Sequence, residues 1–206
     1  MRTVAYTTLE LIFVIVVIGL LASLAIPRVQ RDLRSEAKEN IVSAIRYTQH
    51  KALTDSRVDP FDSSWQKSLW QIRFLTSTID NRAFFYTISS DQNQNGYTSK
   101  IESAIDPANG KYIYSNNGDP NINSDESPNI FIGKKFGINS ISFSGGCRYH
   151  HIAFDQLGRP HNGLNSATDK YSSYMVDDCI LRFGFATDIT PLKITISAET
   201  GYITSE

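Results

Sequence analysis

The sequence predicts an α+β protein, in which a long N-terminal helix with a membrane half and an amphipathic half packs on an antiparallel β-sheet body. Two observations lead to this fold class. A dense apolar block near the N-terminus is followed by a stretch with helical periodicity. The remainder is rich in Ser, Asn, Asp, Tyr and Phe, which is typical of strands joined by polar loops.

The apolar block runs from Leu9 to Ile26 and is interrupted by Glu10 and Ser23. As a helix it would be about 27 Å long, close to the roughly 30 Å of a bilayer's hydrocarbon core. A secretory signal peptide carries its small cleavage-site residue after the apolar core, whereas here Ala5 precedes it. We therefore expect an anchor that is retained in the mature protein.

Glu10 is the most informative residue of this block. A carboxylate near the start of a membrane helix is costly without a partner, which makes it a candidate functional residue. The alternative is an interfacial glutamate that is favoured by the helix dipole.

The order of these features resembles the prepilin cleavage and methylation motif of the type IV pilin-like family. The matching residues are Ala5-Tyr6-Thr7-Thr8-Leu9-Glu10, the apolar run that follows, and Pro27. The resemblance implies that residues 1–5 are a leader, cleaved between Ala5 and Tyr6, and that the new Tyr6 amine is methylated. The family prefers Gly before the cut and Phe after it, so Ala5 and Tyr6 both depart from the pattern.

The resemblance also assigns roles to the mature helix. Glu10 would contact the N-terminal amine of a neighbouring subunit. Pro27 would kink the helix, because proline lacks an N–H and its ring clashes with the preceding turn. The expected division of the chain is a leader at 1–5, a transmembrane and assembly helix at 6–27, an amphipathic helix at 28–57 and a β-rich periplasmic domain at 58–206.

The amphipathic helix carries one apolar stripe, with charged residues on its other face. The stripe comprises Leu33, Ala37, Ile41, Ala44, Ile45, Thr48, Ala52 and Leu53. We expect the helix to end between residues 55 and 59, before Pro60, and a β-sheet to cover the stripe.

The body contains eight short segments with the composition of strands. They are residues 69–75, 83–88, 111–114, 129–132, 141–143, 150–154, 179–185 and 193–197. The stretches FDQLGRP (154–160) and SAETGYI (197–203) resemble the body of H-type minor pseudopilins and minor pilins. The alternative is that Gly158 and Gly201 simply form hairpin turns.

The C-terminal tail and the overall charge give no support for nucleic-acid binding. Some relatives with such a body bind DNA through basic residues in the tail, but residues 201–206 contain no Arg or Lys. The whole chain balances 20 basic against 21 acidic residues. We therefore expect no nucleic-acid partner.

Cys147 and Cys179 are the two cysteines, too few for a disulfide scaffold and without zinc-ligand spacing. They form either one disulfide or two buried thiols. A body on the oxidising side of a membrane favours the disulfide.

Residues 91–102 fit the calcium-loop pattern D-x-[DN]-x-[DN]-G-x5-E. Asp91, Asn93 and Asn95 would supply side-chain oxygens, Tyr97 its carbonyl and Glu102 a bidentate carboxylate. The alternative is an Asx-rich turn whose side chains bond their own backbone. No cofactor is expected to be required, and Ca²⁺ is the one candidate.

Catalysis is not expected. His150 and His151 are adjacent, so on a strand they point to opposite faces, and His50 and His161 have no metal-ligand partner at a suitable spacing. The chain has no nucleophile-elbow, phosphate-loop or zinc motif.

The sequence thus predicts a structural subunit, a minor pilin or pseudopilin of a type IV pilus, type II secretion or competence filament. Its partners would be other pilin subunits, a prepilin peptidase, an inner-membrane assembly platform and membrane lipid. It would be a single-pass protein of a bacterial inner membrane with its body in the periplasm until it joins the filament. The alternative is a membrane-anchored periplasmic binding module, with or without dependence on calcium, that does not enter a filament.

Overall fold

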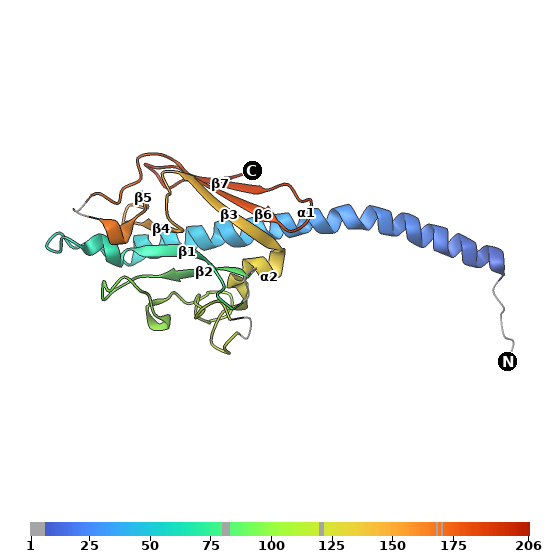
Figure 1. The fold of residues 1–206 in the computed structure, drawn as a ribbon, viewed down its shortest axis with the longest axis horizontal. Helices are drawn as coiled ribbons and strands as arrows, with labels where there is room; N and C mark the ends of the chain where they lie inside the picture. The colour runs from blue at the N-terminus through green and yellow to red at the C-terminus, as the bar shows by residue number, and fades with distance from the viewer. Residues whose placement is uncertain (1–6, 80–82, 120–121, 168, 170) are drawn as a thin grey trace.

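The computed structural model describes residues 7–79, 83–119, 122–167, 169 and 171–206, and in residues 23–32 it describes the helical backbone without the side chains. Figure 1 shows an elongated molecule in which one long helix runs along a β-rich body and then projects far beyond it. The body therefore packs against one face of the second part of the helix and leaves the first part uncovered.

The long helix α1 (Thr8–Thr54) has a defined cap at each end. The Thr7 hydroxyl accepts a hydrogen bond from the Glu10 N–H at 3.3 Å, which is an N-cap contact. At the other end the Asp55 N–H bonds to the Lys51 carbonyl at 2.8 Å. The helix therefore ends next to the range predicted from the sequence, before Pro60.

The second half of α1 buries the predicted apolar stripe against the body. Six of the stripe residues, Ala37, Ile41, Ala44, Ile45, Thr48 and Ala52, are buried. Leu33 is partly buried. Leu53, in the last turn, is 51% exposed, so its assignment to the stripe was wrong.

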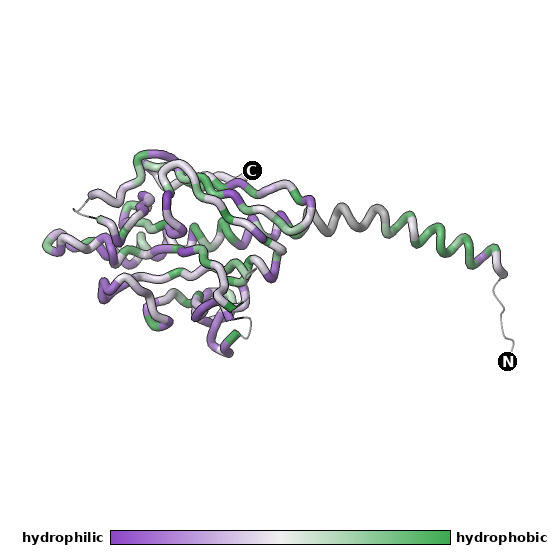
Figure 2. Tube along the Cα trace, viewed as in Figure 1, coloured by the Kyte–Doolittle hydropathy of each residue, from purple (hydrophilic) through white to green (hydrophobic). Residues whose placement is uncertain are grey.

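The expected fold class was wrong in one part, the membrane half of the helix. Within the described residues, no helix contains a stretch that is both long enough and apolar enough to cross a membrane. Figure 2 shows the apolar part of α1 as the green segment near its N-terminal end.

The body is built from two antiparallel sheets rather than one. The first has the order β2-β1-β4-β5 and comprises β1 (Trp70–Thr76), β2 (Phe84–Ser89), β4 (His151–Phe154) and β5 (Pro160–His161). The second has the order β3-β6-β7-β8 and comprises β3 (Ile138–Gly145), β6 (Cys179–Phe185), β7 (Leu192–Ile196) and β8 (Ile203–Ser205). Both sheets contact α1, through β1 and β4 of the first and β7 and β8 of the second.

Alternating burial places one face of each sheet in a common core. In β1, Ile72 and Phe74 are buried with the α1 stripe, and Arg73 between them points to the opposite face. The Phe74 ring lies 6.1 Å from Phe143 of β3 and 5.5 Å from Phe183 of β6, between ring centroids. Phe74 thus joins the first sheet to the second inside the core.

Two of the predicted strands are not strands. Residues 129–132 instead belong to the 3₁₀ helix η3 (Pro128–Ile130) and the short helix α2 (Ile132–Phe136). The Ser127 side chain accepts from the Asn129 N–H at 3.2 Å, and Pro128 suits the first helical position. Residues 111–114 make isolated bridges through Tyr112 and no ladder.

Three further 3₁₀ helices connect the strands. They are η1 (Trp65–Ser68), η2 (Lys100–Glu102) and η4 (Leu164–Ser166). Trp65 of η1 and Leu164 of η4 form a small second cluster with Leu69 and Ala153. This cluster holds the 164–166 segment against the first sheet.

One side chain of α1 holds a turn from each sheet. The Gln49 Nε2 donates to the Gly158 carbonyl at 2.8 Å and to the Gly201 carbonyl at 3.3 Å. Gly158 lies in the β4–β5 turn with φ 77°, and Gly201 lies in the β7–β8 turn with φ 65°. The two sequence stretches that resemble pseudopilin bodies therefore meet at Gln49, and both glycines are turn glycines.

The contact between the two turns leaves no room for a side chain. A Cβ added to Gly201 would lie 2.1 Å from the Gly158 carbonyl oxygen. Gly110 offers a matched comparison, since its φ is 72° and an added Cβ would meet no atom within 4 Å.

We expect Gly201→Ala to destabilise the body far more than Gly110→Ala. The Gly110 variant carries the left-handed strain alone, about 1 kcal/mol, and the Gly201 variant adds a backbone clash that brings the loss to about 3 kcal/mol. Urea unfolding of the two variants beside the unmodified chain measures the difference. Equal losses would mean that the two turns are not in contact.

Candidate functional site

The predicted processing residues Ala5 and Tyr6 lie outside the described residues. The cleavage between them and the methylation of Tyr6 therefore stay predictions. The described part of the candidate assembly site begins at Thr7 and follows the first turns of α1.

The first turns of α1 carry large apolar side chains that no described residue of the chain covers. We name this set the N-terminal apolar surface; it consists of Leu9, Leu11, Ile12, Phe13, Val14, Ile15, Val16, Val17, Ile18, Leu20 and Leu21. These side chains are 36% to 78% exposed. Since they are nearly consecutive, they face all sides of the helix. Soluble monomers rarely expose a contiguous apolar area of this kind, which usually marks an interaction surface.

Glu10 stands in the first turn of this surface. It is exposed, and its backbone N–H is bonded to the Thr7 carbonyl at 3.1 Å and to the Thr7 hydroxyl at 3.3 Å. Among the described residues its carboxylate has no hydrogen-bond or ion-pair partner. The helix dipole favours an acid at this position, and the free carboxylate is available to a cation from another chain.

Pro27 lies inside α1, which continues through that position as one helix. Its side chain lies outside the described residues. The predicted kink stays a prediction, and Figure 1 shows α1 with a gentle curve along its length.

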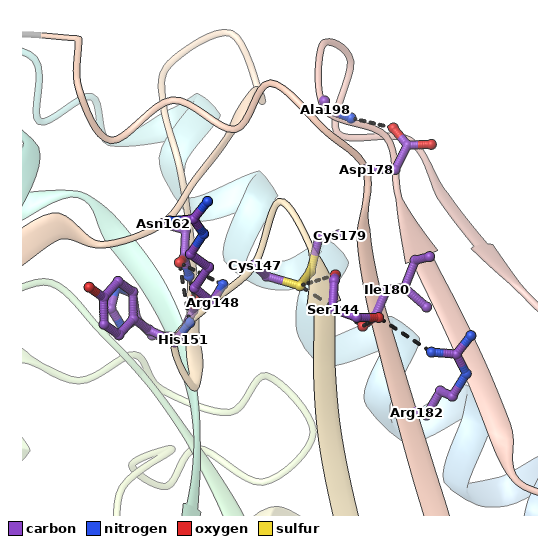
Figure 3. Close-up of a disulfide and its surroundings, with 11 residues drawn as sticks. Ser144, Cys147, Arg148, His151, Asn162, Asp178, Cys179, Ile180, Arg182 and Ala198 are labelled. Carbon is purple, nitrogen blue, oxygen red and sulfur yellow. Dashed lines mark hydrogen bonds between the residues drawn. A yellow bond between two sulfur atoms is a disulfide. The ribbon is translucent and has the colours of Figure 1, made fainter.

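The predicted disulfide is confirmed. Cys147 and Cys179 are joined, with a Cα–Cα distance of 5.0 Å, and link the connection between β3 and β4 to the start of β6 (Figure 3). With a sequence separation of 32 residues, such a cross-link stabilises a fold by about 3–4 kcal/mol in the chain-entropy account.

Asn162 fixes the chain on the other side of the disulfide, as Figure 3 shows. Its Oδ1 accepts from the backbone N–H groups of Arg148 at 3.1 Å and Tyr149 at 3.3 Å. Its amide also donates to the His151 carbonyl. The segment that passes from the second sheet to the first is therefore held at both ends.

The candidate calcium loop is organised by hydrogen bonds to its own backbone. The buried Asp91 accepts from the N–H of Asn95 at 3.2 Å and of Gly96 at 2.7 Å. Asn93 accepts from the Asn95 N–H at 3.0 Å. Likewise the Asn95 side chain accepts from the Tyr97 N–H at 2.8 Å. These are the bonds of an Asx-rich turn.

Glu102 closes the same loop. Its two carboxylate oxygens accept from the N–H groups of Gln92 at 3.1 Å and Ser99 at 2.9 Å, and from the Ser99 hydroxyl at 2.7 Å. Burial opposes the charge of Glu102, but these hydrogen bonds outweigh it, so its pKa is lowered. The loop thus supplies hydrogen-bond donors to the carboxylates of both Asp91 and Glu102.

The positions of the side chains in this loop do not decide whether it binds calcium. Among the described residues, no group of three or more His, Cys, Asp or Glu is placed to hold a metal ion. Asp91 and Glu102 are both turned inward onto N–H donors. Calcium binding therefore stays a prediction.

The structure also reveals a buried polar cluster that sequence reasoning missed. Asp155 Oδ1 accepts from the N–H groups of Leu157 and Arg159, both at 2.9 Å, and Oδ2 accepts from the Arg159 Nε at 2.8 Å and the Tyr174 hydroxyl at 2.9 Å. His161 Nε2 lies 3.5 Å from Asp155 Oδ2, a distance at which the contact is electrostatic rather than a hydrogen bond.

His161 connects Asp155 to the 171–175 segment. Its Nδ1 lies 2.7 Å from the Ser173 hydroxyl, which also contacts the Gln66 side chain. His161 and Ser173 are almost completely buried. Sequence reasoning missed this role of His161. Its contacts, Asp155 and Ser173, are brought next to it only by the folding of the chain.

The environment of Asp155 sets the direction of its pKa. Burial raises it, but the contacts with His161, with the N–H groups of the turn and with the Arg159 guanidinium outweigh burial, so the pKa lies below its ordinary value. The unfolded value is about 3.9. The contribution of Asp155 to stability is therefore complete above that value and is lost as the pH falls through the folded-state pKa.

We expect Asp155→Asn to lower the stability at pH 7 by on the order of 3 kcal/mol, because it leaves Arg159 and several buried donors without their charged acceptor. The deficit relative to the unmodified chain narrows as the pH falls below about 4. Urea unfolding between pH 3 and pH 7 measures both effects.

Asp188→Asn is the matched control, since Asp188 is exposed and has no partner among the described residues. We expect it to change stability by less than about 0.5 kcal/mol. A pH-independent deficit for Asp155→Asn would contradict the ionised state of Asp155.

Comparison of the chain with protein-family models, with curated proteins and with solved structures finds no match. The functional proposal below therefore rests on the residues of this chain.

Proposed function

We propose that this chain is a structural subunit, a minor pilin or pseudopilin, of a type IV pilus, type II secretion or competence filament, and that it assembles through its N-terminal helix. The observation that carries the proposal is the N-terminal apolar surface headed by the unpaired Glu10. The order of residues from Ala5 to Pro27, which resembles the prepilin motif, supports it.

Burial of the N-terminal apolar surface supplies the driving force. Removing a large apolar side chain from water is worth about 1.5–3 kcal/mol. Because this surface surrounds the helix, one partner cannot cover it, and several helices packed around each other can. A bundle of copies or of related subunits is the arrangement that fits such a surface.

Glu10 determines the axial position of each subunit in that bundle. A carboxylate enclosed among apolar helices is expensive unless a cation reaches it. In the proposal, the amine of a neighbouring subunit is this cation. A subunit shifted along the bundle would leave Glu10 buried without a partner, so the charge pair selects one axial position.

The body holds the second half of α1 and leaves the first half free for assembly. The Cys147–Cys179 disulfide supports a body in an oxidising compartment such as the periplasm. In this proposal the partners are other pilin or pseudopilin subunits, a prepilin peptidase and an inner-membrane assembly platform.

We expect Glu10→Gln to reduce incorporation into filaments at least about tenfold, because a charge-assisted contact of about 1.5–3 kcal/mol is lost while the shape is kept. The measurement is the amount of the chain in sheared filaments of the producing cells, divided by its total amount.

Glu36→Gln is the matched control, because Glu36 is an exposed acid on the same helix without a partner among the described residues. We expect it to enter filaments normally. Normal entry of the Glu10 variant would refute the proposed role of this carboxylate.

The chain isolated from filaments should begin at a methylated Tyr6. Mass spectrometry of its N-terminal peptide tests this expectation independently of Glu10. An intact Met1 in assembled material would contradict processing at the Ala5–Tyr6 bond and favour a binding module outside a filament.

A further inference from the structure

Two hollows that share Arg73 in their linings lie on the face of the first sheet that points away from α1, and we name them together the groove. Its first part is a hollow of about 350 Å³ whose floor includes Gln71 and Arg73 of β1 and His151 of β4. Its second part, of about 280 Å³, also has Arg73 in its lining, together with Thr87 of β2. Thr87 and His151 are the cross-strand neighbours of Arg73. Arg73 therefore stands at the junction of the two parts.

The guanidinium of Arg73 is half-buried and has no partner of its own. Among the described residues it makes no hydrogen bond and no ion pair. Burial lowers its pKa and Asp91 raises it, and an arginine stays charged at neutral pH. The Asp91 carboxylate acts on Arg73 electrostatically, but among the described residues no hydrogen bond or ion pair joins the two side chains. The five donors of the guanidinium are thus free for an acceptor in the groove.

His151 shapes the groove without adding a charge. Its Nε2 accepts from the N–H groups of Gly163 at 3.2 Å and Leu164 at 3.4 Å. Burial, followed by the positive charge of Arg73, lowers the pKa of His151 to about 4. The neutral ring stacks on Tyr149 with 5.9 Å between centroids and 13° between planes. The pair forms a rigid aromatic wall beside Arg73.

The second part of the groove contains another unpaired polar group. The Ser115 hydroxyl is buried and has no hydrogen-bond partner among the described residues. It lines this part together with Tyr97 and Tyr114, and Tyr97 is 80% exposed. Since that hydroxyl is enclosed by the chain, the side chains of Tyr97 and Tyr114 offer the contacts in this part of the groove.

We propose that this groove binds an extended peptide segment of another protein, with an acidic side chain of the segment seated on Arg73. A carboxylate matches the planar fork of a guanidinium with two parallel hydrogen bonds. The two hollows on either side of Arg73 receive the flanking residues, one against the Tyr149–His151 wall and one against Tyr97 and Tyr114. Arg and Tyr are the residues that contribute most at protein interfaces.

A segment that spans both hollows is favoured over a small anion by the position of Arg73. A lone phosphate or carboxylate on the guanidinium would leave the rings of Tyr149 and Tyr97 uncontacted. The side chains of a peptide on either side of its acid can pack on these rings. This inference does not depend on filament assembly, since the groove lies on the body and not on the first half of α1.

The experiment uses the full chain, kept in a non-ionic detergent and labelled with a fluorophore, on bead-bound heptapeptide libraries. The central position is fixed as Glu, Gln or phosphoserine, and the other positions are randomised among uncharged residues. We expect Glu-centred beads to retain at least about tenfold more chain than Gln-centred beads, which corresponds to one charge-assisted contact. Arg73→Gln abolishes this preference.

Arg182→Gln is the matched control, since Arg182 is an exposed arginine on β6 of the second sheet and lines neither hollow. It keeps the full preference for Glu. Absence of a preference in the unmodified chain, or its persistence in Arg73→Gln, would overturn the proposal. Retention on phosphoserine without retention on Glu would overturn the assignment to a carboxylate.

Tyr97→Ala tests the second half of the groove and leaves the charge of Arg73 in place. Because the Tyr97 side chain is 80% exposed, the variant should fold about as stably as the unmodified chain. We expect about threefold weaker retention on Glu-centred beads with the preference over Gln intact. Unchanged retention would mean that the bound segment does not reach Tyr97, and would overturn the two-sided arrangement.

Discussion

The contact on which the rest of the body depends is the one between Gln49 and the turns at Gly158 and Gly201. A single amide group on α1 donates to one carbonyl from each sheet. The turns are so close that the Gly201 position tolerates no side chain. The spacing between the two sheets is therefore set at the helix, by hydrogen bonds, and is maintained in the core by Phe74 between Phe143 and Phe183. These contacts hold the two sheets in a fixed position relative to each other.

This arrangement divides α1 into two parts with different surroundings. The two sheets bury the apolar stripe between Ala37 and Ala52. No part of the described body extends far enough to cover the residues before Ala22. The apolar side chains of the second half of the helix are thus buried within the chain, whereas those of the first half remain exposed to solvent. Because the sheets face the helix with their buried sides, the opposite face of the first sheet is left for Arg73 and its groove.

The parts of the structure that follow local rules could be predicted from the sequence. The stripe from Ala37 to Ala52 and the strand at residues 179–185 follow the helical and strand periodicities, and the structure has both. Residues 129–132 look like a strand because they are apolar, but Ser127 and Pro128 start a helical turn there. The Arg73 groove, Gln49 and the Asp155 cluster were not predictable, because each depends on segments distant in sequence. The prediction of a membrane half was wrong, because no helix among the described residues is long and apolar enough to cross a membrane.

The loop at residues 91–102 shows how one pattern of residues serves two requirements. The spacing of Asp91, Asn93 and Asn95 suits a cation, because alternate side-chain oxygens can converge. The same spacing suits a closed turn, because those oxygens also reach the N–H groups two to five residues ahead. In this chain the turn gives the loop a fixed shape by itself, and Glu102 ties its end to its start. That fixed shape places Gly96 beside the first hollow of the groove and Tyr97 beside the second. It also bonds the Asp91 carboxylate to backbone donors, while among the described residues no hydrogen bond or ion pair joins Asp91 to the Arg73 guanidinium.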